Sequence, residues 1–488
     1  MKKSGKKILF VTSSFEEISL MTTKKDNKKG VKLGAESHYA LGIAYLHSYL
    51  ESQGITVESL CFNHLDYETC KNQVIEKINS FSPDFVGIQM LTPNRVSSYM
   101  LIEYIHKNHP KIKIILGGIH ATVMYDQLLK KYPYVIIVLG EGELTLTEIV
   151  KSKTADSKKI KGIVFFKKGK IIMTPPRELI EDLDSLPFPK HELFFNTPRD
   201  SACILSSRGC PFKCSFCSLN PLTKRRVRFR SPKNVVDEIE YLVKRFPQIK
   251  EIWFHDDSLF VDNERVIEIC KEILRRGIKK DFIASGRIKP LSERMIRFLE
   301  RANFKRVLLG VESGDNDILR MANKGINQED IINAFKMFAK SKINIKPFII
   351  IGLPGENEKT IKNTINLIKK LQRIKYHPYT DGAILTVYPG TQVYELAKQK
   401  GMMTDDFWMS DKPTPAYTAE NSLEKLYELK EEFLDNLSLF RMLTLRGFIL
   451  QFPLLPYTLK YVFWTKRKAL VNYSARKIKS IFRINKKN

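Results

Sequence analysis

The sequence has few cysteines and no long apolar run. It contains 7 cysteines among 488 residues, and four of them stand singly, at Cys61, Cys70, Cys203 and Cys270. A secreted disulfide framework needs a higher density, so this count predicts a reduced, cytoplasmic compartment. Because no run of about 18 apolar residues occurs, no membrane-spanning helix is expected. The apolar run at residues 8–11 is too short for a signal-peptide core.

Acidic residues are scarce toward the C-terminus. The chain carries 81 Lys and Arg against 53 Asp and Glu, a net charge of +28. Residues 436–488, termed the basic tail, hold twelve Lys and Arg and no Asp or Glu. Such an excess indicates an anionic partner, which can be a nucleic acid, a membrane surface or an acidic substrate.

The basic tail mixes its cations with large apolar side chains, and two interpretations follow. One is peripheral contact with the anionic inner face of a membrane. Pro453 and Pro456 interrupt the apolar run, which argues against a spanning segment. The other is a helical subdomain that packs on the preceding domain and closes a substrate cavity. Nucleic acid is the disfavoured partner, because no added RNA-binding module is visible in the sequence.

The order of patterns predicts an α/β protein. Short β-branched runs alternate with helical patterns over residues 1–150, which favours a doubly wound parallel sheet. Residues 151–200 form a connector. Six further strand–helix units over residues 201–402 predict a partial (β/α)6 TIM-type barrel. For residues 403–488 the sequence predicts a helical, basic and amphipathic C-terminal region.

Small residues follow the strands of the first domain. They are Thr92, the pair Gly117 and Gly118, and the pair Gly140 and Gly142. Ligands of such sheets bind at the carboxyl ends of the strands, and glycine lets a bulky ligand approach the backbone closely. Ordinary turn chemistry would give the same residues, so both interpretations stay open here.

Three cysteines stand close together in C-x3-C-x2-C, at Cys210, Cys214 and Cys217. A structural zinc site would require a fourth Cys or His at short spacing, and none is present. A [4Fe–4S] cluster held by three thiolates leaves one iron with an open position. The motif therefore predicts an iron–sulfur cluster with an exchangeable ligand.

Further polar residues fall where the barrel strands are expected to end. They are His255, Asp256, Asp257, Ser285, Arg287, Glu312 and residues 352–356. Chemistry in barrels sits at the C-terminal ends of the strands. Each residue also has an ordinary alternative: His255 or Asp257 could cap a helix, Glu312 could pair with an arginine, and Gly352 could form a turn.

The cysteine motif after a first barrel strand resembles the radical S-adenosylmethionine (SAM) superfamily. The blocks "FHDDSLF", "GVESGDNDILRMANKG", "IIGLPGENEKTI" and "TVYPGTQVYELA" follow in that superfamily's order. The first domain, with "LGGIHAT" and "LGEGE", is similar to the B12-binding domain of the cobalamin-dependent branch. Together the resemblance covers about residues 6–402.

The resemblance implies roles for the residues in these blocks. The three cysteines would hold the cluster, whose open iron would bind SAM, and reduction would yield a 5′-deoxyadenosyl radical. Phe216 would lie against the adenine, and Gly352 to Gly355 would let the backbone approach it. Ser285, Arg287 and Glu312 would hold the ribose and methionine, with Asp257 also among the SAM contacts. Thr92 and the four glycines of the first domain would contact cobalamin.

One departure from the wider B12 family concerns the lower cobalt ligand. Many B12 proteins carry D-x-H-x-x-G, and this sequence has no such motif. The cobalamin-dependent radical SAM branch often lacks it, so the resemblance implies cobalamin bound without a protein histidine on cobalt. A vestigial scaffold is the alternative for this domain.

The expected activity is methyl transfer to an unactivated carbon of a hydrophobic, lipid-like or isoprenoid-like metabolite. Radical cyclisation, oxidation or rearrangement of such a substrate, including tetrapyrrole ring closure, is the alternative. A non-catalytic B12 or iron–sulfur sensor is a third interpretation, which the complete run of SAM blocks argues against. The enzyme would need a low-potential electron donor such as a ferredoxin or flavodoxin.

Overall fold

The computed structural model describes residues 6–15, 39–62, 65–152, 159–195, 199–377 and 380–443. The chain divides into two compact units, residues 1–431 and residues 432–488. Helix α16 (Leu423–Leu443) runs from the first unit into the second. Most of the basic tail, residues 444–488, lies outside the described residues, so its predicted membrane or packing role stays a prediction.

The first unit begins with a seven-stranded sheet, sheet A, in the order β2-β1-β3-β4-β5-β6-β7. Its parallel strands are β1 (Lys7–Thr12), β2 (Thr56–Cys61), β3 (Phe85–Gln89), β4 (Lys113–Gly117) and β5 (Ile136–Val138). A hairpin of β6 (Ile163–Lys167) and β7 (Lys170–Met173) continues the sheet in antiparallel fashion. The hairpin lies within the predicted connector, where the stretch "GIVFFKKGKIIMTPP" is typical of a hairpin.

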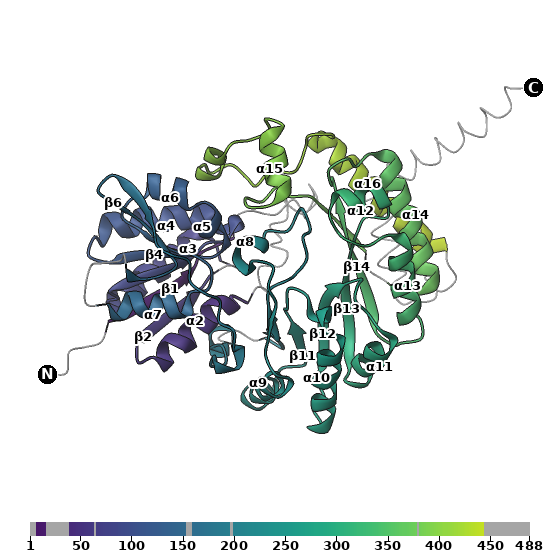
Figure 1. The fold of residues 1–488 in the computed structure, drawn as a ribbon, viewed down its shortest axis with the longest axis horizontal. Helices are drawn as coiled ribbons and strands as arrows, with labels where there is room; N and C mark the ends of the chain where they lie inside the picture. Colours follow the sequence, from purple (N-terminus) through teal and green to yellow (C-terminus); the bar gives the residue numbers. More distant parts are fainter. Residues whose placement is uncertain are drawn as a thin grey trace, which may run out of the picture. The chain divides into compact units, whose positions relative to one another are not determined.

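Both faces of sheet A are covered by helices, as a doubly wound sheet requires (Figure 1). Successive residues of β1 enter two different cores: Leu9 and Val11 pack on one face, while Ile8 and Phe10 pack on the other. The first core includes α3 (Tyr67–Phe81), α4 (Arg95–Asn108) and α6 (Tyr125–Lys131); the second includes α2 (Leu41–Ser52) and α7 (Glu143–Lys151). The predicted fold of this domain is confirmed.

The second sheet, sheet B, is parallel throughout, in the order β15-β14-β13-β12-β11-β8. Its strands are β8 (Ser201–Ile204), β11 (Glu251–Phe254), β12 (Asp281–Arg287), β13 (Phe304–Glu312), β14 (Asn344–Ile351) and β15 (Asp381–Ile384). The strands β8 and β15 stand at opposite ends of this order, so the six units form a partial, curled barrel, as predicted.

Helices lie along the outer face of sheet B (Figure 1). They are α9 (Pro232–Arg245), α10 (Asn263–Arg275), α11 (Glu293–Arg301), α13 (Gln328–Phe338) and α14 (Glu358–Ile374). Helix α9 shows why they form: Ser231 caps its N-terminus by accepting from the Asn234 N–H, and Pro232 occupies the first turn. Its apolar stripe, including Ile239 and Leu242, is buried.

A short hairpin stands beside sheet B. Strand β9 (Ser207–Arg208) pairs antiparallel with β10 (Arg228–Phe229). The residues between them, 209–227, are termed the cysteine loop, and they contain all three predicted cluster ligands and α8 (Asn220–Thr223). Within the described ranges, no helix combines the length and apolar character needed to cross a membrane.

Candidate active site

The polar residues singled out in the second domain gather at one edge of sheet B. Asp257 follows β11, Arg287 ends β12, Glu312 ends β13 and Gly352 follows β14. Because all these strands are parallel, their C-terminal ends form one rim, where the chemistry of barrel folds sits. Ser285 lies two residues before Arg287 on β12 and is half-buried.

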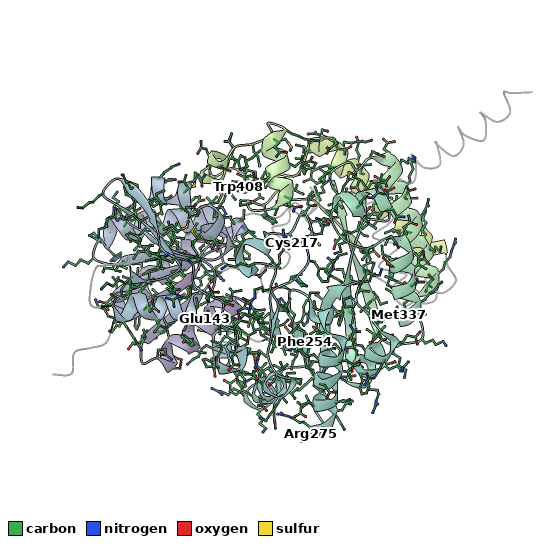
Figure 2. All side chains as sticks on the ribbon, in the orientation of Figure 1. Glu143, Cys217, Phe254, Arg275, Met337 and Trp408 are labelled. Carbon is green, nitrogen blue, oxygen red and sulfur yellow. The ribbon has the colours of Figure 1, made fainter. Side chains whose placement is uncertain are left out.

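The cysteine loop is anchored to the rim on two sides. The Ser215 N–H donates to the Ala322 carbonyl at 3.0 Å, and the Val393 N–H donates to the Ser215 carbonyl at 3.1 Å. All three cysteines of the loop are free thiols; Cys214 is buried, whereas Cys210 and Cys217 are half-buried. Figure 2 labels Cys217. Burial raises the pKa of both half-buried thiols, that of Cys217 to about 11.

Arg287 reaches the buried cysteine of this loop. Its Nη1 lies 2.9 Å from Cys214 Sγ, and its guanidinium lies 3.8 Å from the centre of the Phe212 ring. Its Nε is buried and has no hydrogen-bond partner in the structure. A fixed cation beside sulfur suits a site that must hold thiolates.

The donor set fits an iron–sulfur cluster. Three thiols and no other ligand type stand in the motif, which is the set such clusters use. Among the described residues, no three His, Cys, Asp or Glu side chains are already arranged to hold a metal ion. In a [4Fe–4S] cluster each thiolate binds a different iron, so the three thiols need not converge on one point.

Glu312 forms a buried ion pair with Lys324, whereas the alternative drawn from the sequence was a pair with an arginine. Its backbone is left-handed, with φ of +66°, an uncommon conformation for a residue other than glycine that concentrates at functional sites. Lys324 Nζ lies 2.6 Å from Glu312 Oε1 and 5.8 Å from the centre of the Phe216 ring. A Cβ on Gly310 would lie 2.5 Å from that carboxylate oxygen. Lys324 thus lies beside both Glu312 and Phe216. This group suits a ligand that has charges of both signs and an aromatic base.

The turn after β14 is built around a second buried carboxylate. Gly352 and Gly355 both have positive φ, +89° and +83°. The Gly352 N–H donates to Glu356 Oε2 at 2.5 Å, while Glu356 Oε1 is buried without a partner. Burial raises the pKa of Glu356 to about 8.

Asp257 connects the rim to a cavity against the first domain. Its Oδ2 accepts from the Gly209 N–H at 2.9 Å, next to the first cysteine. The side chain is exposed to the cavity, yet the surrounding protein removes enough water to raise its pKa to about 6.

The cavity has a volume of about 290 Å³ and draws its walls from both domains. From the first domain it is lined by four of the predicted cobalamin-contact glycines, Gly117, Gly118, Gly140 and Gly142. From the second it is lined by Gly209 and Asp257, among others. The predicted cobalamin-contact glycines and the first residue of the cysteine loop, Gly209, therefore line the same cavity.

Two of these glycines leave room for a ligand. A Cβ on Gly117 or Gly140 would meet no atom within 4 Å. By contrast, a Cβ on Gly118 would lie 2.6 Å from the Met90 carbonyl oxygen, and one on Gly142 would lie 3.0 Å from Leu46. The first pair forms a bare cradle that a corrin ring can approach closely, and the second pair is required by packing.

Thr92 does not line this cavity. It is buried, and its Oγ1 lies 3.2 Å from Nδ1 of His120. The other ring nitrogen of His120, Nε2, lies 3.0 Å from the Tyr99 hydroxyl. Burial lowers the pKa of His120 to about 3, so this ring is neutral. Thr92 therefore takes part in a buried polar contact, and its predicted cobalamin contact stays a prediction.

Sequence reasoning also missed charged residues in the cavity wall. Glu141, Glu143, Arg208 and Arg228 all line it and pair with one another across the two domains. The glutamates belong to "LGEGE", and Arg208 lies two residues before the first cysteine of the motif. Their pairing was hidden because at least 65 residues separate the partners.

Comparison with known proteins agrees with this geometry. The family model of the radical SAM superfamily matches residues 204–368, and that of the B12 binding domain matches residues 32–150. An uncharacterized methyltransferase of Pyrococcus horikoshii is 30% identical over 81% of this chain and 85% of its own length. An anaerobic magnesium-protoporphyrin IX monomethyl ester cyclase of Rubrivivax gelatinosus is 30% identical over 67% of this chain and 61% of its own length.

A solved structure shares the fold of both domains. The cobalamin-dependent SAM radical enzyme OxsB with aqua-cobalamin bound superposes with a TM-score of 0.66 at 19% identity, covering 82% of this chain and 62% of that one. The chain belongs to the radical SAM superfamily, in the branch that carries a B12-binding domain, and is an enzyme whose cofactors are a [4Fe–4S] cluster, SAM and cobalamin.

Proposed function

We propose that this enzyme transfers a methyl group to an unactivated carbon of a hydrophobic metabolite. The observation that carries the proposal is the shared cavity, which is lined by Gly117 and Gly140 on one side and by Gly209 and Asp257 on the other. A bound cluster with SAM supplies radical chemistry and bound cobalamin supplies a transferable methyl group. A substrate carbon in this cavity would lie within reach of both.

The protein's own residues would bind and orient these groups. Cys210, Cys214 and Cys217 would hold the cluster, with the Arg287 guanidinium beside the sulfur of Cys214. Glu312 and Lys324 offer opposite charges to the amino and carboxylate groups of SAM's methionine, although they pair with each other here. The ring of Phe216 and the backbone at Gly352 and Gly355 would lie along the adenine, and Ser285 and Asp257 would complete the contacts.

An exposed phenylalanine on β14, Phe348, supports a substrate with an apolar part, and Lys346 Nζ lies 5.8 Å from the centre of its ring. Strand β14 alternates: Ile345, Ile349 and Ile351 are buried, whereas Phe348 between them is 39% exposed. Because α13 and α14 cover one face of the strand, the alternate residues face the barrel interior. An exposed phenylalanine there offers an apolar surface to a substrate.

A product assay tests the methyl transfer. Reconstituted, reduced enzyme is incubated with SAM carrying a labelled methyl group and a metabolite extract, and the products are separated by mass spectrometry. We expect 5′-deoxyadenosine and one product that carries the label. Release of 5′-deoxyadenosine with an unlabelled product would instead support radical cyclisation or oxidation, which the cyclase relative favours. If no 5′-deoxyadenosine forms with any substrate, both the proposed methyl transfer and the alternative radical reactions fail.

A second cavity suggests that the substrate also carries an anionic group. It has a volume of about 450 Å³ and is lined by Cys217, Lys224, Arg225 and Gln392, among others. Both cations are exposed, and no acidic residue is among the described residues that line this cavity. Once the metabolite is known, the Lys224→Gln, Arg225→Gln double variant should raise KM at least about tenfold with kcat nearly unchanged. An unchanged KM would remove the anionic group from the proposal.

Two partners complete the proposal. Reduction of the cluster requires a low-potential electron donor such as a ferredoxin or flavodoxin. The basic tail, with twelve cations and no acidic residue, would hold the enzyme at an anionic membrane surface where hydrophobic metabolites accumulate.

A further inference from the structure

The hairpin that frames the cysteine loop carries an unusual pair of charges. Arg208 on β9 stands directly opposite Arg228 on β10. Like charges in directly opposed positions destabilise a strand pair. This two-stranded ladder is the frame from which residues 209–227 emerge, so the repulsion falls at the base of the cysteine loop.

Two carboxylates of the first domain neutralise these arginines. Arg208 Nη1 donates to Glu141 at 3.2 Å and its Nη2 donates to Glu143 at 2.8 Å. Arg228 Nη1 donates to the other oxygen of Glu141 at 2.9 Å. Burial would raise the pKa of Glu141, but the hydrogen bond from Arg228 and the charge of Arg208 hold it below its ordinary value. The carboxylate therefore stays charged between the two guanidinium groups.

The four side chains are buried enough for the pairing to matter. Their side-chain exposures are 16% for Arg208 and Glu141, 4% for Glu143 and 5% for Arg228. Removing one partner of a buried ion pair leaves an uncompensated charge, which is strongly destabilising. The hairpin thus depends on the loop of the first domain that supplies the two carboxylates.

That same loop forms part of the cobalamin cradle. Gly140 and Gly142 alternate with Glu141 and Glu143 along the chain, and all four residues line the 290 Å³ cavity. A corrin ring resting on the bare backbone of Gly140 would fix the loop that places both carboxylates. Ordering of the cysteine loop by a cluster would in turn fix Arg208, two residues before Cys210.

We propose that this group of four charges couples the two cofactor sites, with Arg208 as the positioning residue. Cobalamin binding and cluster binding then favour each other, because each orders one side of the same ion-pair group. The coupling is reciprocal, as thermodynamic linkage requires. It concerns cofactor binding alone, so it stands or falls independently of the methyl transfer proposed above.

The experiment measures the affinity of the full-length protein for hydroxocobalamin by anaerobic equilibrium dialysis. Each protein is tested without iron and after reconstitution with iron and sulfide. We expect wild type to bind hydroxocobalamin at least about fivefold more tightly with the cluster, the lower bound of typical coupling. In Arg208→Met, this ratio should fall to about 1.

Three further variants make the test specific. Glu143→Gln removes one negative charge of the group and should lower the ratio, while both arginines of the hairpin stay in place. Arg208→Lys keeps the charge but cannot span two carboxylates, so it should restore only part of the ratio. The control is Arg276→Met, because Arg276 also pairs with three carboxylates, Asp237, Glu240 and Glu272, away from the cavity.

Several outcomes would overturn the proposal. A wild-type ratio near 1 shows that the sites are not coupled. An unchanged ratio in both Arg208→Met and Glu143→Gln shows that coupling runs elsewhere. An equal fall in Arg276→Met shows a general loss of stability.

Discussion

Two neighbouring glycines at the end of β4 have opposite surroundings. Above Gly117 there is open cavity, whereas Gly118, with φ of +95°, lies against the Met90 carbonyl. Gly117→Val should weaken cobalamin binding at least about tenfold with little change in melting temperature, because its side chain enters the cavity. Gly118→Ala should instead lower the melting temperature, because it is strained and clashes with backbone. Dialysis and calorimetry on both variants check this, and the reverse result would place the cradle elsewhere.

Glu356 predicts a pH dependence of stability. The folded state holds its proton up to about pH 8, whereas an unfolded glutamate releases it near 4.5. The stability that the protonated group contributes is complete below about pH 4.5 and is lost as the pH rises through 8. Glu356→Gln cannot ionise, so its stability relative to wild type should rise between pH 5.5 and pH 8 by on the order of 2–3 kcal/mol.

Thermal melts of both proteins across this pH range measure the difference. The same substitution at the exposed Glu268 is the control and should leave the profile of wild type unchanged. If wild type and Glu356→Gln melt in parallel at every pH, Glu356 is ionised in the fold.

At the scale of elements, the cysteine loop is the part that a cluster must organise. The Cys210→Ala, Cys214→Ala, Cys217→Ala variant removes every thiol of the motif and should lose the visible absorbance of the cluster. The two cores that cover sheet A contain none of the three cysteines, so sheet A should still fold. Its hydroxocobalamin affinity should equal that of wild type without iron. Retained cluster absorbance would assign the ligands to other residues.

Elements with regular periodicity were predictable from the sequence. The buried run of β1 and the capped, amphipathic pattern of α9 are examples. In both, residues close together in the sequence determine the secondary structure. Lys324 was missed because it follows α12 (Asn316–Met321) on an irregular turn, where no period indicates that it faces Glu312. Thr92 was predicted to contact a ligand because it follows a strand. The sequence could not show its contact with His120, because that contact forms only in the folded chain.

At the scale of the whole molecule, the basic tail carries +12 of the net charge of +28. Truncation after Leu443 keeps α16 and removes eleven Lys and Arg. Each cation near an anionic membrane contributes about 1 kcal/mol, so truncation should abolish most cosedimentation with phosphatidylglycerol vesicles. Raised salt should weaken binding of the intact protein in the same way. Equal sedimentation of both proteins would show that the tail does not bind the membrane.

One apolar core of the first unit joins residues that are far apart in the chain. Leu101 and Leu128, from helices over sheet A, share it with Val393, Tyr394 and Trp408 (Figure 2). During synthesis at roughly 5–20 residues per second, about 280 residues separate the two sides, or roughly 15–60 s. The first domain therefore emerges from the ribosome with an apolar face that lacks its native cover for that interval. Slow translation or a missing C-terminal segment would prolong this exposure, which makes the nascent chain a client for chaperones that hold unfinished domains.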